Sequence, residues 1–177
     1  TKRKVPAAVI TSFLLLPLWW TEAVAQSREK VVQILNEQAA KSVTREISSR
    51  NVRASYYLCN IAESEAVAQT ADRIRRNFGA VDVLANNAGT VVGKSFFDIT
   101  LEEMQRTMNV NFWGHLFFTK AFIGPDGHLK IPHLWPVNIA SSSGLIGMPM
   151  LSAYAASKFA EVGFSEALRR EIGRAHV

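Results

Sequence analysis

Two kinds of hydrophobic pattern alternate along this chain. One places an apolar residue every three or four positions among charged ones, which predicts surface helices, and it covers residues 27–49, 62–78, 100–122 and 153–172. The other is a short apolar run of strand character, and it covers residues 52–59, 81–85 and 137–140. Strands that alternate with helices of this length indicate an α/β domain built on a parallel sheet.

Single residues mark the ends of several of these elements. Gly79 stands directly after the second helical stretch, where glycine ends a helix well because it adopts positive φ. Thr100 and Glu103 have the T-x-x-E spacing of a capping box, which predicts the start of the third helix. Pro136 precedes the last strand-like run. Because proline cannot donate within a central strand, we expect it at the first residue of that strand or at a distortion.

The beginning of the chain differs from the rest. A basic start is followed by an almost uncharged run at residues 5–20 that contains two prolines, a pattern that imitates a secretory signal peptide. The run is shorter than the ~20 residues that span a membrane, so two interpretations stay open: an interfacial or re-entrant anchor, or a buried strand. Residues 7–11 are a further candidate, the remnant of a first strand. We therefore divide the chain into an apolar segment at 1–26, a folded domain at 27–172 and a tail at 173–177.

Composition and charge narrow the possible functions. The formal net charge of +5 is modest and no stretch interleaves basic with aromatic residues, so we expect no binding of nucleic acid. The single cysteine, Cys59, cannot form an internal disulfide, which fits a cytosol-facing location. We expect it to serve packing. His128 and His133 lack a cysteine or carboxylate at metal-ligand spacing, so we expect no metal site.

Residues 141–158 carry the candidate chemistry. Tyr154 and Lys158 are four positions apart and share one face if the segment is helical. A fixed positive charge beside a phenol favours the phenolate, which makes the pair a candidate acid/base. The spacing alone is weak evidence, because a tyrosine packed under a lysine stem gives the same pattern. Ser141 follows the last strand-like run, at the ligand edge of a parallel sheet, where its hydroxyl can hold a substrate oxygen.

Two asparagine motifs strengthen this interpretation. Asn86-Asn87-Ala88-Gly89 follows a strand-like run, and Asn111 lies in the third helix, where asparagine lowers helix propensity. The order and spacing of N-N-A-G, V-N-x-x-G, a serine and Y-x-x-x-K resembles the short-chain dehydrogenase/reductase family. The resemblance runs from about residue 52 to residue 172.

A finer resemblance is to the membrane-associated branch that contains retinol dehydrogenases and 17-beta-hydroxysteroid dehydrogenase type 11. The stretches that carry it are residues 106–111, His115, residues 119–122 and residues 156–164. The resemblance implies reversible oxidation of a lipid-like alcohol, of the retinoid or steroid class, to a carbonyl with NAD or NADP. It also implies a homodimer and a cytosol-facing place on the endoplasmic reticulum membrane or a lipid droplet; a cytoplasmic location is the alternative.

The resemblance assigns roles to particular residues. Tyr154 takes the hydroxyl proton, and Lys158 supports the tyrosine and holds the nicotinamide ribose. Ser141 binds the substrate oxygen, and Asn111 positions a relay water. The residues matched to cofactor-binding positions are Asn60, Ile61, Asn87, Ala88, Gly89, Tyr154 and Lys158. Asn60 stands where the family has an aspartate, and asparagines of the N-N-A-G motif also pin neighbouring strands. We expect His115 to be packed and hydrogen-bonded instead of acting as a base.

The fold that the resemblance implies is a Rossmann-like doubly wound parallel sheet, and we expect it to be incomplete. No glycine precedes Gly79, so the first strand with its glycine-rich turn is expected to be missing. The last strands are expected to be missing too, as in a truncated member. Glu22 alone offers a hint to cofactor selectivity, and NAD and NADP both stay open.

Two other functions stay open beside the dehydrogenase. The first is a catalytically inactive module for dimerisation or membrane association. The second is a nucleotide-sugar epimerase or dehydratase relative with the same Tyr/Lys pair.

Overall fold

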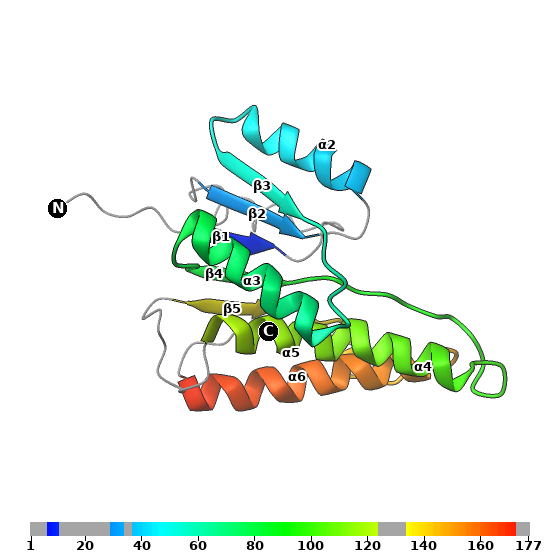
Figure 1. Ribbon diagram of the computed structural model, residues 1–177. Coiled ribbons are helices and arrows are strands. Elements are labelled where there is room, and N and C mark those ends of the chain that lie inside the picture. Colours follow the sequence, from blue (N-terminus) through cyan, green and yellow to red (C-terminus); the bar gives the residue numbers. More distant parts are fainter. Residues whose placement is uncertain (1–6, 11–28, 34–36, 124–133, 173–177) are drawn as a thin grey trace.

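Five parallel strands form the sheet on which the chain is built. The computed structural model describes residues 7–10, 29–33, 37–123 and 134–172. The strands are β1 (Ala7–Ile10), β2 (Glu29–Gln33), β3 (Arg53–Tyr57), β4 (Val83–Asn86) and β5 (Trp135–Asn138). They lie in the order β3-β2-β1-β4-β5 and all neighbouring pairs are parallel (Figure 1). This is the order of a doubly wound sheet with its switch point between β1 and β4, so the predicted fold class is confirmed.

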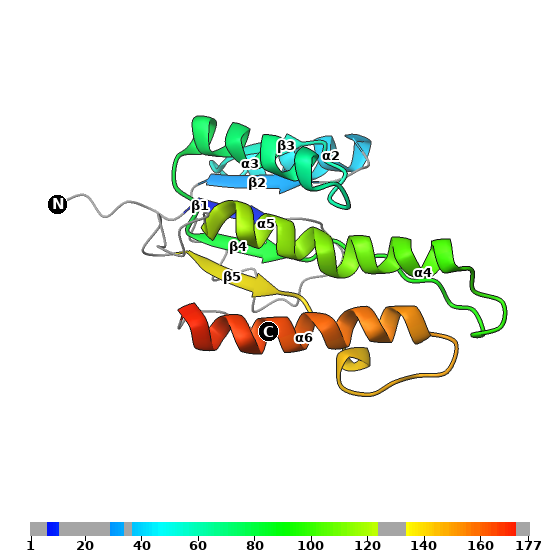
Figure 2. The ribbon, with the colours of Figure 1, turned by 60° about the horizontal axis from the view of Figure 1, so that its bottom comes forward.

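The helices cover both faces of this sheet. They are α2 (Glu37–Ser48), α3 (Ser64–Phe78), α4 (Leu101–Met108), the π-helical turn η1 (Asn109–Trp113), α5 (Gly114–Ile123), the short 3-10 helix η2 (Ser142–Gly144) and α6 (Ser152–Ile172). Right-handed crossovers that run in opposite directions along a sheet place their helices on opposite faces. Accordingly α2 lies on one face, and α3, α5 and α6 lie on the other (Figures 1 and 2).

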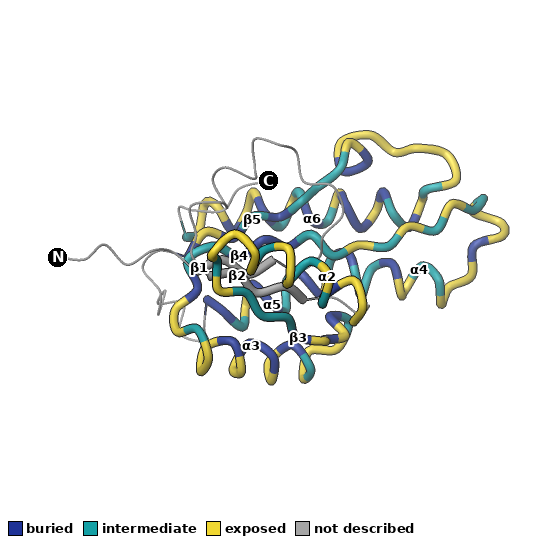
Figure 3. The backbone as a smooth tube through the Cα atoms, turned by 90° about the horizontal axis from the view of Figure 1, so that it is seen from above, coloured by how far each residue is buried: buried dark blue, intermediate teal, exposed yellow. Residues whose placement is uncertain are grey.

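The hydrophobic core lies between the sheet and the helices α3, α5 and α6. Its fully buried members include Ile74 of α3, Leu84 of β4, Phe118 of α5 and Leu134 beside β5. In Figure 3 the helical turns alternate between buried and exposed along α3 and α6, as expected for amphipathic helices on a core. Among the described residues, no helix combines the length and the apolar character needed to cross a membrane.

The N-terminal half of the sheet corrects two expectations. We expected one helix over residues 27–49, but residues 29–33 form β2 and the helix begins at Glu37. The physical reason is pairing: β2 lies between β1 and β3 in register with both, and two ladders outweigh a helical spacing that is ambiguous over so short a run. We also expected the first strand to be missing. Instead, Ala7–Ile10 lies between β2 and β4 as β1.

The position of β2 changes the account of the connection before it. Residues 11–28 join β1 to β2. This connection is long enough for a parallel crossover, which needs a dozen or more residues. Its sequence contains no glycine. The anchor and strand interpretations of residues 11–20, and the selectivity hint at Glu22, lie outside the described residues. The structure ends the second strand at Gln33, so Glu22 does not stand at its end.

Several element boundaries are as predicted. Gly79 ends α3 with a φ of 82°, and Thr100 starts α4 with both hydrogen bonds of the capping box to Glu103. The third helix is interrupted by the π-turn η1, which the spacing did not predict. α6 covers the predicted fourth helix, and the tail at 173–177 lies outside the described residues.

Pro136 is the second residue of β5, not the first. The backbone N–H groups of Trp135 and Ile139 donate to the carbonyls of Asp82, directly before β4, and Asn86, the last residue of β4, at 2.7 and 2.8 Å. Because alternate N–H groups along a strand point to opposite sides, the position of Pro136 faces away from β4. The proline therefore removes no hydrogen bond from the β4–β5 ladder.

Candidate active site

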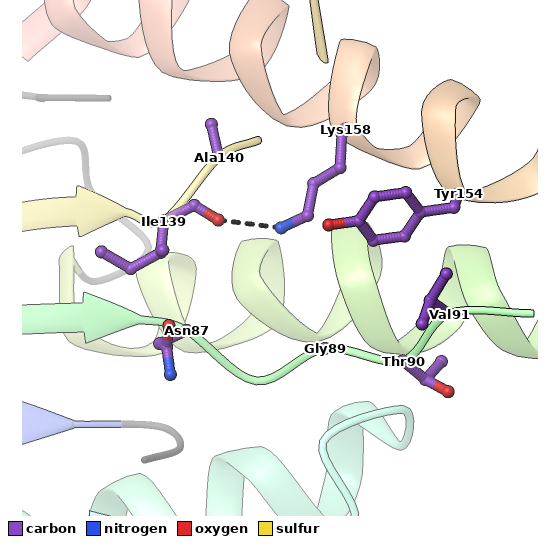
Figure 4. Close-up of a pocket in the computed structure, with 8 residues that line it drawn as sticks. All are labelled: Asn87, Gly89, Thr90, Val91, Ile139, Ala140, Tyr154 and Lys158. Atoms are coloured by element: carbon purple, nitrogen blue, oxygen red, sulfur yellow. Dashed lines mark hydrogen bonds between the residues drawn. The ribbon is translucent and has the colours of Figure 1, made fainter. Parts of the chain in front are cut away.

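A cleft of about 320 Å³ opens at the carboxyl ends of β4 and β5. Its walls come from three segments: the stretch after β4, the stretch after β5, and the first turns of α6. The lining residues are Asn87, Gly89, Thr90, Val91, Ile139, Ala140, Tyr154 and Lys158 (Figure 4). Ligands of open α/β sheets bind outside the carboxyl ends of the strands. The cleft therefore lies at the ligand-binding edge of this fold.

Tyr154 and Lys158 meet in this cleft, as the four-residue spacing predicted. Figure 4 shows the phenol hydroxyl of Tyr154 pointing toward the Lys158 ammonium. Lys158 is only 5% exposed, and its Nζ donates to the carbonyl oxygen of Ile139 at 2.8 Å. This bond ties the lysine to the residue that follows β5. The ammonium is therefore fixed in place beside the phenol, between the sheet and α6.

Asn111 lies in the π-turn η1 and is fully buried. Its Nδ2 donates to the Thr90 carbonyl at 2.9 Å and to Ser157 Oγ at 3.0 Å, and its Oδ1 accepts from the Thr90 N–H at 2.8 Å. Single π-turns within helices often occur at functional sites. Here the amide holds the stretch after β4, which lines the cleft, against α6. Asn111 thus contacts the cleft wall without itself lining the cleft.

Ser141 follows Ala140, which lines the cleft, but its own side chain is not part of the lining. Its Oγ accepts a hydrogen bond of 3.2 Å from the Ser143 N–H and so caps η2. The sequence placed Ser141 correctly at the end of the strand. Its local role as a helix cap was not predicted.

The N-N-A-G motif divides its residues between packing and the cleft. Asn86 is buried, and its Nδ2 donates to Thr119 Oγ1 at 2.9 Å and to Asn138 Oδ1 at 2.8 Å, which joins β4 to β5 and α5. Asn87 and Gly89 line the cleft. The two roles considered for this motif are thus held by different residues, strand pinning by Asn86 and access to the cleft by its two neighbours.

Asn60 and Ile61 do not line the cleft, although they match cofactor-binding positions of the family. Asn60 is exposed, and its Nδ2 donates to Glu63 Oε1 at 2.8 Å while its Oδ1 accepts from the Ala62 N–H. Ile61 is buried in the core. It fits closely over Gly114, where an added Cβ would lie 2.7 Å from the Ile61 side chain.

A buried carboxylate that the sequence did not single out completes the site. Glu161 is 1% exposed; its Oε2 accepts from Lys158 Nζ at 2.6 Å, and its Oε1 lies 2.6 Å from His115 Nδ1. The other ring nitrogen of His115 lies 2.7 Å from the Ala88 carbonyl oxygen. His115 is thus packed and hydrogen-bonded, as predicted. Glu161 follows Lys158 by three positions, so helical spacing alone places them together.

Cys59 and the two candidate metal-ligating histidines remain. Cys59 lies in the core, and burial raises the pKa of its thiol, so it is a poor nucleophile. Within the part of the chain that the structure describes, no group of three or more metal-ligating side chains comes together. His128 and His133 lie outside that part.

The sequence of the chain matches a known protein family. The family model described as short chain dehydrogenase matches residues 21–177, and the chain belongs to that family. Similar curated proteins include retinol dehydrogenases. Epidermal retinol dehydrogenase 2 of Homo sapiens is 40% identical over 138 residues, which is 75% of this chain and 41% of the relative. Retinol dehydrogenase 10-B of Danio rerio is 34% identical over 151 residues, 85% of this chain and 44% of the relative. The chain spans less than half the length of these relatives.

Two solved structures have a similar fold. The crystal structure of a variant of actinorhodin polyketide ketoreductase with NADPH superposes with a TM-score of 0.86 at 26% identity, covering 96% of this chain and 66% of that one. A metagenomic short-chain oxidoreductase in complex with NADP gives a TM-score of 0.82 at 24% identity, covering 94% and 77%. The second likeness concerns the fold alone.

Proposed function

We propose that this chain carries the proton-transfer half of an NAD(P)-dependent oxidoreductase that interconverts a lipid-like alcohol and its carbonyl. The observation that carries the proposal is the meeting of Tyr154 and Lys158 in one cleft at the carboxyl edge of the sheet. A phenol beside a fixed ammonium is suited to exchange a proton with an alcohol oxygen. The similarity to retinol dehydrogenases supports a retinoid or steroid alcohol as the substrate class.

In the proposed reaction Tyr154 acts on the substrate. Its phenol oxygen is directed into the cleft. As the phenolate it takes the proton of the alcohol during oxidation, and as the protonated phenol it returns a proton to the carbonyl oxygen during reduction. Lys158 stabilises the phenolate form through its charge. Its Nζ has three N–H donors, of which Ile139 and Glu161 accept two; the third is available to the phenol or to a ribose hydroxyl.

The residues along the stretch after β4 fit a bound nicotinamide cofactor. Gly89 presents no side chain, and an added Cβ there would meet nothing closer than 3.7 Å, so a ligand can approach the backbone. Asn87 and Thr90 line the same wall. When bound, NAD or NADP supplies the acceptor or donor of hydride. Asn87, Gly89 and Lys158 would hold it, and Ser141 and Asn111 keep their proposed roles beside the substrate oxygen and a relay water.

Product analysis tests this proposal. The purified chain is incubated with NAD or NADP and either all-trans-retinol, a steroid alcohol or a nucleotide sugar, and both cofactor reduction and products are followed. We expect reduced cofactor and a retinoid or steroid carbonyl in equal amounts. Epimerised or dehydrated sugar instead would favour the nucleotide-sugar alternative. No conversion of any alcohol by a chain that binds the cofactor would contradict the proposal.

A non-catalytic module is the second candidate, and one feature of the sequence favours it. The connection between β1 and β2 contains no glycine, whereas a glycine-rich turn there brings backbone N–H groups to a pyrophosphate. Each lost charge-assisted hydrogen bond weakens binding by about 1.5–3 kcal/mol. Calorimetric titration separates the candidates: binding of NAD or NADP supports the enzyme, and no binding at millimolar cofactor supports the module.

We further propose a homodimer at a cytosol-facing membrane or lipid-droplet surface as the setting of the reaction. The support is the apolar sequence of residues 11–20, after β1, and several large apolar side chains that are exposed. These are Phe96, Phe97, Leu101, Leu145 and Ile146. Light scattering after size exclusion tests the dimer, and flotation with phospholipid vesicles tests the surface. A monomer that stays unbound would overturn both parts.

A further inference from the structure

Besides Tyr154, three titratable side chains form a buried cluster behind the cleft. Lys158, Glu161 and His115 are 5%, 1% and 1% exposed. Glu161 uses one oxygen for each of the other two, with both contacts at 2.6 Å. The chain of contacts runs from the Ala88 carbonyl through His115 and Glu161 to Lys158, and it ends beside Tyr154.

The donors and acceptors in this cluster determine where one of its protons lies. The Ala88 carbonyl can only accept, so His115 Nε2 carries a hydrogen and donates to it. His115 Nδ1 and Glu161 Oε1 are 2.6 Å apart, and without a hydrogen between them both would be acceptors. One proton therefore lies in this contact. Whether it sits on the imidazole or on the carboxyl, the cluster with the Lys158 ammonium has the same net charge of about one positive unit.

The shared proton determines the net charge beside the Tyr154 phenol. An ionised Glu161 by itself would cancel the charge of Lys158, because opposite charges in contact in a buried site offset each other at short range. The proton shared with His115 offsets the carboxylate instead. Lys158 then keeps a net positive field toward Tyr154 although a carboxylate holds it in place.

We propose that His115 and Glu161 are positioning residues of the proposed reaction. Glu161 fixes the Lys158 ammonium, and the proton that His115 brings preserves the net positive charge that favours the Tyr154 phenolate. The inference rests on the proposed function, in which Tyr154 exchanges the proton with the substrate. The titratable groups of the described residues at this cluster are Tyr154, Lys158 and Glu161 on α6 and His115 on α5. The carbonyl oxygens of Ile139 and Ala88 contact Lys158 and His115.

Ultraviolet titration of Tyr154 tests the inference without turnover. The chain has three tyrosines, so the spectrum of a variant minus that of the same variant with Tyr154→Phe reports ionisation of this one phenol. In His115→Phe the shared proton is gone and Glu161 cancels Lys158. We expect the titration midpoint of Tyr154 to rise by roughly one pH unit or more.

Two further variants at Glu161 separate an effect of charge from an effect of packing. Glu161→Gln keeps both contacts, because its amide oxygen accepts from Lys158 and its NH₂ donates to His115 Nδ1, and the midpoint should stay or fall. The double variant His115→Phe/Glu161→Gln removes the uncompensated carboxylate, and the midpoint should return toward that of the wild type. Glu166→Gln, at an exposed position of the same helix, is the charge control and should leave the midpoint unchanged.

Equal midpoints in wild type and His115→Phe, or no return in the double variant, would overturn the inference. If His115→Phe does not fold, His115→Gln carries the same test, because its neutral amide can bond to Glu161 but adds no positive charge to offset the carboxylate. The acid limb of the pH profile for alcohol oxidation should move in the same direction as the titration. A shift of the titration without any turnover would contradict the proposed function alone, and turnover without a shift would contradict this inference alone.

Discussion

The two halves of the sheet differ in how their polar side chains are used. Around β4, β5 and α6, the amides, hydroxyls and charged groups form linked buried contacts that run from Asn86 to Glu161 and end at the cleft. Around β3, the hydrogen-bonded polar side chains form separate pairs that are exposed or only partly buried, such as Asn60 with Glu63 and Asn77 with Tyr57. Buried polar networks define one arrangement of their members. The candidate site therefore lies in the half of the sheet whose buried hydrogen bonds fix the positions of its side chains.

Breaking the buried network should have the largest effect on stability. Asn138→Leu leaves Asn86 without one acceptor and Ser165 without the donor that lies 2.6 Å away. Unpaired buried polar groups cost about 1–3 kcal/mol each, so we expect unfolding in urea to show a loss of about 3 kcal/mol. Asn77→Ala in the β3 half removes an exposed amide bonded to Tyr57 and should cost less than about 1 kcal/mol. Equal losses would remove the distinction between the halves.

Two glycines allow the same change to be made against the backbone of Lys158 and against the core residue Ile61. At Gly144 an added Cβ would lie 2.8 Å from the Lys158 carbonyl oxygen, and at Gly114 it would lie 2.7 Å from the Ile61 side chain. Overpacking of this kind costs about 1–3 kcal/mol, so both alanine variants should melt earlier. Only Gly144→Ala presses on the backbone of Lys158, so it alone should lower turnover per folded molecule. Equal activity in the two folded variants would contradict this.

The pair of Glu103 and Lys94 gives a pH-dependent effect. The hydrogen bond from Lys94, then that from the Thr100 backbone, holds the pKa of Glu103 below its usual range. A carboxyl with a lowered folded pKa stabilises the folded state above its unfolded value and loses that contribution as pH falls through the folded value. Glu103→Gln should thus lower stability at neutral pH and match the wild type in acid. Urea melts at both pH values check this, and a loss that persists in acid would contradict it.

The smallest effect is expected from Asn60. Because its side chain is paired with Glu63 and does not line the cleft, Asn60→Ala should change the Kd of NAD or NADP by less than about twofold. Lys158→Met, which removes a residue of the cleft wall, should weaken it much more. Calorimetry on both variants checks the contrast, and equal weakening would place Asn60 in the cofactor site.

Local signals in the sequence predicted the elements whose boundaries depend on neighbouring residues. Gly79, the capping box at Thr100 and the spacing of Tyr154 and Lys158 all depend on contacts within one turn of chain. β2 was missed because its pairing with β1 and β3 connects residues far apart in the sequence. The contact between Glu161 and His115 was missed for the same reason, because it joins residues far apart in the sequence. The spacing of Lys158 and Glu161 was a local signal that was not used.

Local contacts hold two residues that the resemblance matched to cofactor-binding positions. Asn60 bonds to the start of α3 and Ile61 fills the space over Gly114, and their part in cofactor binding stays a prediction. The π-turn around Asn111 has no simple periodic signal, because one additional residue in a helical turn changes the spacing only locally. The roles of Ser141 and Asn111 in catalysis stay predictions.

The central claim is that the Tyr154 phenol exchanges the proton of the substrate alcohol. The most direct test compares Tyr154→Phe with Tyr56→Phe, which removes a hydroxyl that donates to Glu37 far from the cleft. Rates of alcohol oxidation with NAD or NADP are measured at equal amounts of folded protein. We expect Tyr154→Phe to lower the rate by at least about 100-fold and Tyr56→Phe to leave it nearly unchanged. A rate in Tyr154→Phe close to that of the wild type would show that another group handles the proton and would contradict the account.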